Sequence, residues 1–233
     1  MKLIITRPEQ DSVTLARKLS DMGHEAVVVP LLEIVAHSKI EIPDKPFAAI
    51  LVTSANGVRC LPAGAVSHSV RVIAIGAQSA EAARARGFHT VESHGGDVEH
   101  LAAWIVEHLS PASGSLLYVT GKDISGDLAG VLLQHGFEVH RVETYQAQAK
   151  PLTLSLQDIA GCDGVLLYSP RSAKLWLGEA KLQGLNSAVA LLRHYCLSPA
   201  IAHVLPHYWP ISVASQPTDR ALLQLLERAN KEA

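Results

Sequence analysis

The fold is decided by a pattern that the chain contains twice: MKLIITRPEQDSVTLARKLSDMGHEAVVVPLL (Met1–Leu32) and GSLLYVTGKDISGDLAGVLLQHGFEVHRVETY (Gly114–Tyr145). The two copies align without a gap at an offset of 113 residues. Identical residues at matching positions include Leu3 and Leu116, Leu15 and Leu128, Leu19 and Leu132, and Gly23 and Gly136. An internal repeat of this size determines the architecture before any single motif does.

Each copy is predicted to fold as a strand, a helix and a second strand. Leu15 and Leu19 are four residues apart, as on one face of a helix. Gly23 follows them and is the residue type that most readily adopts a left-handed C-cap. The apolar runs at both ends of the copy indicate strands. The pattern is therefore a βαβ unit, present twice.

The segments that follow the two copies also correspond. Phe47–Leu61 resembles Cys162–Trp176, with Ser54 at the position of Ser169. At an offset of 122, further matches are Ala80 and Ala202, Val91 and Val213, Asp97 and Asp219, and Leu101 and Leu223. The chain is thus a duplication of about half its length, in the order A-B-A′-B′.

Most predicted strands are continuous apolar runs such as AAILV, VIAI and VLLY, which is typical of parallel strands covered on both faces. We expect an α/β fold with two doubly wound parallel sheets of five strands each. The strands are expected near residues 2–6, 24–30, 48–53, 71–75, 89–92, 115–119, 137–143, 164–168, 195–198 and 211–214.

Two extended, partly polar segments interrupt the pattern at matching places. They cover residues 33–43 and 143–154, and we interpret them as a two-stranded linker between domains. One domain is then discontinuous, formed by residues 1–32 and 155–233. The other, residues 44–142, is inserted between the linkers.

Composition excludes several classes of protein. The length of 233 residues suits one or two domains, and 48% apolar residues are enough for a buried core. The formal net charge is −2 and aromatic residues make up only 5%, so nucleic-acid binding is not expected. Pro199, Pro206, Pro210 and Pro217 interrupt the charge-free stretch at 194–218, so no membrane span is expected.

The cysteines indicate a reducing compartment. Cys60, Cys162 and Cys196 are odd in number and have no CxxC spacing. No signal-peptide pattern is present at the first residues. We therefore expect a cytoplasmic protein, and since no heptad or apolar stripe demands a partner, a monomer.

The expected ligand-binding positions lie at the carboxyl ends of the strands, where open parallel sheets bind ligands. Nearly every such loop carries Gly, Ser or Thr and leads into a helix, which favours anions. Each hydroxyl can alternatively be an ordinary helix cap. These loops contain Thr6-Arg7-Pro8, Thr53-Ser54, Gly76-Ala77-Gln78-Ser79, His94-Gly95-Gly96, Thr120-Gly121-Lys122 and Ser169-Pro170-Arg171.

Motifs for nucleotides, metals and triad hydrolases are absent from the sequence. The segment from His94 to His100 contains ligand-type residues but lacks His spacing of i,i+4, so we interpret it as a loop in which Asp97 caps a helix. No metal and no cofactor are expected.

The sequence resembles the uroporphyrinogen-III synthases of tetrapyrrole biosynthesis along essentially its whole length. The resemblance rests on strings whose order and spacing are more specific than any one of them. They are ITRP (5–8), LVTSANGV (51–58), AIGAQSAEAARARG (74–87), LYVTGKD (117–123), VETYQA (142–147) and YSPRSA (168–173).

The resemblance implies a cofactor-independent cyclising lyase with two α/β domains and an active site in the cleft between them. Its small-molecule substrate would be the linear tetrapyrrole hydroxymethylbilane. The product would be uroporphyrinogen III, formed with loss of water and inversion of the last pyrrole ring. Because the substrate carries many carboxylates and reactive pyrroles, positioning can supply much of the catalysis.

The resemblance also implies roles for individual residues. Tyr145 matches the tyrosine favoured as general acid for the departing hydroxyl, although it is alternatively an ordinary aromatic residue of the linker. Ser79 matches a hydroxyl that is either a ligand contact or a helix cap. Expected substrate-binding residues are Arg7, Thr53, Ser54, Ser79, Gly121, Lys122, Ser169 and Arg171. For Arg7 the alternative is that it anchors the first loop.

One half of the sequence departs from the pattern. Ile201 stands where the resemblance leads us to expect Thr, and Trp209 stands where Gly usually ends the helix. A non-catalytic tetrapyrrole or polycarboxylate binder of the same fold is therefore the alternative. A glycosyltransferase or periplasmic-type binding fold is a third possibility, disfavoured by the missing nucleotide-site glycines and signal peptide.

Overall fold

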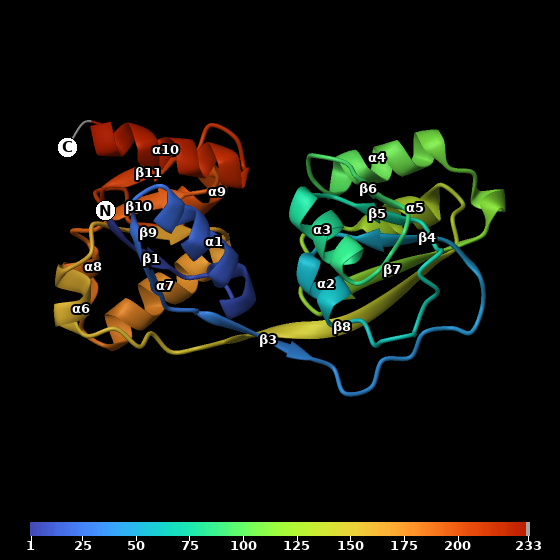
Figure 1. Cartoon of the computed structure of the whole chain (residues 1–233), viewed down its shortest axis with the longest axis horizontal. Helices are drawn as coiled ribbons and strands as arrows, with labels where there is room; N and C mark the ends of the chain where they lie inside the picture. Colours follow the sequence, from blue (N-terminus) through green and yellow to red (C-terminus); the bar gives the residue numbers. More distant parts are fainter. Residues whose placement is uncertain (232–233) are drawn as a thin grey trace. The chain divides into compact units, whose positions relative to one another are not determined.

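The computed structural model describes residues 1–231, which form two compact units. Unit 1 contains Met1–Glu33 and Gln148–Ala233, and unit 2 contains Ile34–Ala147. Both are α/β structures built on mainly parallel sheets, so the predicted fold class is confirmed (Figure 1). No described helix is long and apolar enough to cross a membrane.

Unit 1 is built on a five-stranded sheet in the order β11-β10-β9-β1-β2, with every neighbouring pair parallel. Its strands are β1 (Lys2–Ile5), β2 (Glu25–Val28), β9 (Gly164–Leu167), β10 (Arg193–Cys196) and β11 (Ile211–Val213). Its helices are α1 (Glu9–Asp21), α6 (Leu156–Ala160), α7 (Pro170–Leu182), α8 (Asn186–Val189), α9 (Pro199–Ala202) and α10 (Asp219–Lys231).

Unit 2 is built on a six-stranded sheet in the order β3-β8-β7-β4-β5-β6. Its strands are β3 (Leu32–Ala36), β4 (Phe47–Val52), β5 (Val72–Ala74), β6 (Val91–Ser93), β7 (Ser115–Gly121) and β8 (Val139–Ala149). Its helices are α2 (Ala55–Arg59), α3 (Ala77–Ala85), α4 (Val98–His108) and α5 (Leu128–Gln134), with a short 3-10 helix at Pro111–Ser113.

The duplication is visible in the order of the strands. β7 and β8 correspond to β1 and β2, and β4, β5 and β6 correspond to β9, β10 and β11, so both sheets contain the same five-strand order. Both βαβ units form, and the glycines that end their helices, Gly23 and Gly136, have φ of 78° and 82° as the left-handed C-cap requires.

The prediction of two five-stranded sheets is wrong for unit 2, because Leu32–Ala36 adds a sixth strand. The His37 N–H donates to the Thr144 oxygen and the Lys150 N–H donates to the Leu31 oxygen, each at 2.9 Å. Residue numbers decrease from His37 to Leu31 while those of their partners increase from Thr144 to Lys150, so β3 runs antiparallel to β8. The boundaries of the two units fall within these strands, and we propose that residues 33–43 and 143–154 link the units.

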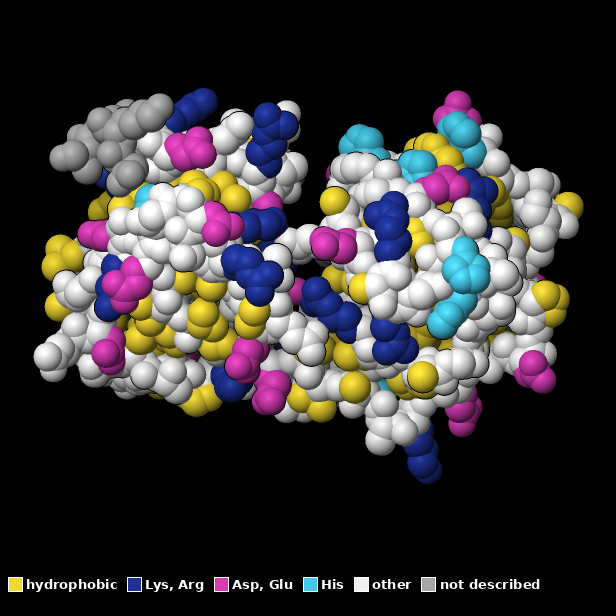
Figure 2. Space-filling model, viewed as in Figure 1, with side chains coloured by type: hydrophobic (Ala, Val, Ile, Leu, Met, Phe, Trp, Pro, Cys, Tyr) yellow, Lys and Arg dark blue, Asp and Glu magenta, His cyan; other side chains and the backbone are white. Residues whose placement is uncertain are grey.

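Each sheet is covered by apolar side chains on both faces, which explains the continuous apolar runs. In β4, Ile50 and Val52 belong to one buried cluster, whereas Ala49 and Leu51 belong to another. In β1, Ile4 packs on one face, with Leu3 and Ile5 on the other. Alternate residues of one strand therefore enter two cores. Within each unit, acidic and basic side chains are interspersed on the face shown in Figure 2.

Candidate active site

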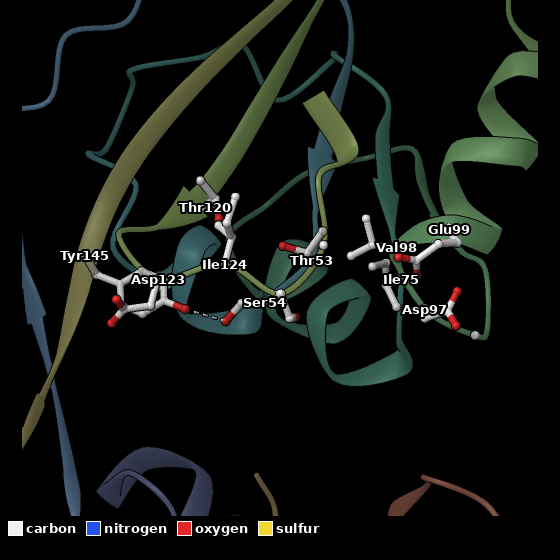
Figure 3. A pocket seen from close by; sticks show the side chains of 13 residues that line it. Thr53, Ser54, Ile75, Asp97, Val98, Glu99, Thr120, Asp123, Ile124 and Tyr145 are labelled. Atoms are coloured by element: carbon white, nitrogen blue, oxygen red, sulfur yellow. Dashed lines mark hydrogen bonds between the residues drawn. The ribbon is translucent and has the colours of Figure 1, made fainter. Parts of the chain in front are cut away.

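A cavity of about 460 Å³ lies at the carboxyl ends of the strands of unit 2. Because all strands of the repeated five-strand order are parallel, the loops after β4, β5 and β7 meet at this edge. The cavity is lined by Thr53, Ser54, Ile75, Gly96, Asp97, Val98, Glu99, Thr120, Asp123, Ile124, Ser125, Gly126 and Tyr145 (Figure 3). Three predicted site residues, Thr53, Ser54 and Tyr145, are thereby brought together.

Ser54 lies between the end of β4 and the start of α2. Its backbone is extended, with φ −144° and ψ 135°, and its side chain accepts a hydrogen bond from the Asn56 N–H at 3.2 Å. Ser54 is therefore the N-cap of α2. The same oxygen accepts the hydroxyl hydrogen of Tyr145 at 3.0 Å, across 91 residues of sequence (Figure 3).

A β-bulge in β8 sets the direction of Tyr145. Thr120 pairs with Glu143, but the next residue, Gly121, pairs with Tyr145, so Thr144 is the additional residue. The fully buried Thr144 hydroxyl is 2.9 Å from the Gly57 oxygen and 3.3 Å from the Thr120 oxygen. These contacts tie the bulge to α2 and β7.

Gly121 provides the space for the phenol ring. A Cβ atom at this position would lie 2.6 Å from Cζ of Tyr145, closer than real Cβ contacts occur. The Lys122 N–H then donates to the Tyr145 oxygen of the backbone at 2.8 Å. Gly121 and Lys122 therefore support Tyr145 and are not among the residues that line the cavity.

Thr53 lies beside Ser54 and contacts the interior of the sheet. Its Oγ1 is 3.2 Å from the hydroxyl of Tyr118, which is almost fully buried. The loop after β4 thus carries two consecutive hydroxyls, one directed to the core and one bonded to Tyr145. Both side chains line the cavity.

The charged side chains that line the cavity are all carboxylates: Asp97, Glu99 and Asp123. Asp97 is the N-cap of α4, as the sequence predicts, and accepts from the His100 N–H at 3.0 Å. That backbone bond and the His100 ring lower the pKa of Asp97, which therefore stays ionised. This charge balance favours a neutral or cationic part of a ligand over a carboxylate.

Arg7 is held by two carboxylates in unit 1. It lies 3.2 Å from Asp11 and 3.6 Å from Asp219, and its guanidinium carbon is 4.4 Å from the centre of the Tyr168 ring. Its side chain is only 12% exposed. These contacts join the end of β1 to α1 and α10, which is the loop-anchoring alternative that the sequence left open.

The other predicted residues have local structural contacts. Ser169 is the N-cap of α7 and accepts from the Ser172 N–H at 3.0 Å, and Arg171 is exposed in the first turn of that helix. Ser79 is buried in α3, whose N-cap is Gly76, so the capping alternative for Ser79 is wrong. Ile201, where Thr was expected, is 1% exposed and packs in the same core as Trp209.

Thr144 and Asp123 are site residues that were not predicted from the sequence. Asp123 follows a predicted strand end, Thr120-Gly121-Lys122, so extending that loop by one residue would have found it. The part played by Thr144 depends on the pairing register of β7 and β8, which no sequence pattern indicates.

The fold and the cavity together define a duplicated α/β protein with a cavity at the carboxyl ends of its parallel strands, where open α/β sheets bind ligands. The sequence profile of one family, described as uroporphyrinogen-III synthase HemD, matches residues 13–224. The chain belongs to the uroporphyrinogen-III synthase family.

Individual relatives are more distant. The porphyrin biosynthesis protein HemD of Ruminiclostridium josui is 27% identical over 164 residues, which is 62% of this chain. The match spans only 31% of that relative's length. The crystal structure of a uroporphyrinogen-III synthetase from Helicobacter pylori is similar with a TM-score of 0.64 and 17% identity, covering 98% of this chain and all of the other.

A second solved structure, a mutant uroporphyrinogen III synthase from Thermus thermophilus, has a TM-score of 0.52 and 14% identity, with both chains covered completely. At such low identities the two solved structures support the fold alone. The family assignment rests on the profile match.

Proposed function

We propose that the protein is a uroporphyrinogen-III synthase that closes hydroxymethylbilane to uroporphyrinogen III, with inversion of the last pyrrole ring and loss of water. The observation that carries the proposal is the family match over residues 13–224, within which Tyr145 lines a strand-end cavity. The reaction removes water while forming a ring, so the enzyme is a cyclising lyase.

The cavity offers the groups that the first step needs. Departure of the hydroxyl requires a proton, and the Tyr145–Ser54 pair supplies two hydroxyl hydrogens at the cavity wall. Loss of hydroxide leaves positive charge on the pyrrole, which the carboxylates of Asp97, Glu99 and Asp123 at the cavity wall stabilise.

The same carboxylates repel the acetate and propionate groups of the substrate. We therefore infer that the cavity receives the hydroxymethyl-bearing ring, whose N–H group is a donor. The substrate carboxylates would bind at other strand ends, where Arg171 and the helix N-termini are candidates. No metal or cofactor takes part in this proposal.

The test is the product isomer. The protein is incubated with freshly prepared hydroxymethylbilane, the products are oxidised to porphyrins, and isomers I and III are separated by chromatography. Spontaneous closure gives isomer I only, so isomer III formed in proportion to protein concentration supports the proposal. Isomer I alone, at the rate seen without protein, contradicts it.

If isomer III is not formed but hydroxymethylbilane or uroporphyrinogen still binds, the protein is a non-catalytic tetrapyrrole binder of the same fold. The buried Ile201 is the observation that favours this alternative, because this position carries no hydroxyl. Equilibrium binding measured by fluorescence quenching separates binding from turnover.

We also propose that the protein acts as a monomer in the cytoplasm. Cys60, Cys162 and Cys196 are free thiols, which supports a reducing compartment. Light scattering at several protein concentrations tests the monomer. A mass that rises to that of a dimer over the working range contradicts it.

A further inference from the structure

We propose that Ser54, and not Tyr145, gives its proton directly to the departing hydroxyl of the substrate, with Tyr145 replacing that proton through the hydrogen bond between them. The inference rests on the proposed function and adds a second catalytic residue to it.

The hydrogen bonds of Ser54 determine whether its hydroxyl can still donate or accept a hydrogen bond. A serine hydroxyl has one hydrogen and two lone pairs. The oxygen of Ser54 accepts from the Asn56 N–H at 3.2 Å and from the Tyr145 hydroxyl at 3.0 Å, so both lone pairs are used. Among residues 1–231, the structure shows no hydrogen bond that the Ser54 hydroxyl donates. Since Ser54 lines the cavity, a ligand can accept that hydrogen.

Tyr145 is oriented to support this bond. Its hydroxyl hydrogen is directed at Ser54, so it cannot simultaneously be donated to a ligand. The bulge at Thr144 and the missing side chain of Gly121 hold the ring in this direction. A hydroxyl that receives a hydrogen bond becomes a better donor, so Tyr145 strengthens Ser54 as an acid.

The C–O bond of the hydroxymethyl group breaks, its electron pair stays with oxygen, and the pyrrole nitrogen supplies electrons to the remaining carbon. The Ser54 hydrogen passes to the leaving oxygen, which departs as water. The Tyr145 hydrogen passes to Ser54, leaving a phenolate. Ring closure later releases one proton from a pyrrole carbon, and this proton restores Tyr145.

The test compares single-turnover rates of isomer III formation in wild type, Ser54→Gly, Tyr145→Phe and the double variant. Glycine is chosen because it retains most of the stability of an N-cap while removing the hydroxyl. In a relay, loss of either hydroxyl breaks the same path. We therefore expect each single variant to be about 100-fold slower and the double variant to be no slower than either.

Two controls address folding and capping. Ser54→Thr retains both a hydroxyl and a cap and is expected to restore most of the rate. Ser155→Ala removes the capping hydroxyl of α6 in unit 1 and should leave the rate unchanged. Thermal unfolding of all variants shows whether a slow variant is folded. If Ser54→Gly does not fold, Ser54→Cys, which has only a weak donor, replaces it in the comparison.

A second measurement distinguishes a relay from a structural role. In mixtures of H₂O and D₂O, transfer of two protons in one step gives a curved dependence of the rate on deuterium content, whereas transfer of one proton gives a line. Three results would each overturn the relay. They are a linear dependence of the wild-type rate on deuterium content, a rate loss in the double variant equal to the product of the two single losses, and an effect of Ser54→Gly on KM alone. If wild type forms no isomer III at all, it is the proposed function that fails.

Discussion

Gly121 lies directly beneath the ring of Tyr145, where a Cβ atom would be 2.6 Å from Cζ. The pairing of these two residues follows the bulge at Thr144, so a single backbone irregularity determines both the space for the ring and its direction. The site therefore depends on a residue that has no side chain.

Gly121→Ala is expected to displace the Tyr145 ring and to break its bond to Ser54. Because the ring is the neighbour that must move, we expect at least a tenfold loss of isomer III formation and a loss of about 1–3 kcal/mol in the free energy of unfolding. Gly178→Ala is the control: its Cβ meets nothing within 4 Å, and it should stabilise α7 by about 0.5–1 kcal/mol. Equal activity of the two variants would contradict the prediction.

Thr144→Val removes the buried hydroxyl that anchors the bulge while keeping the shape of the side chain. It leaves two buried carbonyl oxygens without this donor, so the free energy of unfolding should fall by about 1–3 kcal/mol. Activity should fall as well, because Tyr145 is the next residue. Denaturant unfolding measures the first effect, and Thr14→Val, at an exposed position of α1, should change stability by less than about 0.5 kcal/mol.

Tyr145→Phe keeps the ring over Gly121 and removes only the hydroxyl. The expected result is a loss of about 10²-fold or more in kcat with little change in thermal stability. Tyr208→Phe, at a side chain that is 71% exposed, is the matched control and should behave as wild type. Unchanged turnover in Tyr145→Phe would remove this residue from the catalytic role.

Arg7→Lys tests whether Arg7 is a structural anchor or a substrate contact. Lysine cannot reproduce contacts to Asp11, Asp219 and the Tyr168 ring at once, so we expect the free energy of unfolding to fall by about 1–3 kcal/mol. KM for hydroxymethylbilane should change less than about twofold. A large rise in KM with unchanged stability would instead show that Arg7 binds substrate.

His194 predicts an acid-dependent loss of stability. It is fully buried, its Nε2 accepts from Trp176 Nε1 at 3.1 Å, and burial lowers its pKa to about 4. Above about pH 6.5, His194 is neutral in both the folded and the unfolded chain, so its burial does not lower the free energy of unfolding. As the pH falls from 6.5 to about 4, only the unfolded chain binds the proton, and the free energy of unfolding falls by about 3 kcal/mol in all.

The measurement is the free energy of unfolding of wild type and His194→Gln between pH 7 and pH 4. Glutamine can still accept the Trp176 hydrogen bond but does not titrate. The difference between the two proteins should therefore narrow as the pH falls. A constant difference over this range would show that His194 does not titrate as described.

The repeat at an offset of 113 predicted most of the fold, because Leu15, Leu19 and Gly23 and their counterparts mark a βαβ unit by local pattern alone. Residues 33–43 were predicted as an extended part of a two-stranded linker, but not as a strand of the sheet of unit 2, since Leu32–Ala36 joins that sheet only through pairing with β8, more than one hundred residues later. Such long-range pairing leaves no periodic signal in a five-residue segment.

For the site, the strand-end rule placed Thr53 and Ser54 at the cavity, and the resemblance added Tyr145. The bond between Ser54 and Tyr145 was not predictable, because it depends on a bulge that shifts the register by one residue. Capping roles were also ambiguous, because they depend on the residue at which each helix begins. Ser54 and Asp97 cap helices, whereas Ser79 is the third residue of its helix.

The shared strand order has a consequence for the order in which the chain can fold during synthesis. The sheet of unit 2 is complete once residue 149 has been made. In unit 1, by contrast, Leu3 pairs with Gly164, and β1 lies inside the sheet between the central strand β9 and the edge strand β2. β1 is therefore synthesised about 160 residues before its partner β9, and until β9 is available its apolar edge must be kept from pairing with other nascent chains.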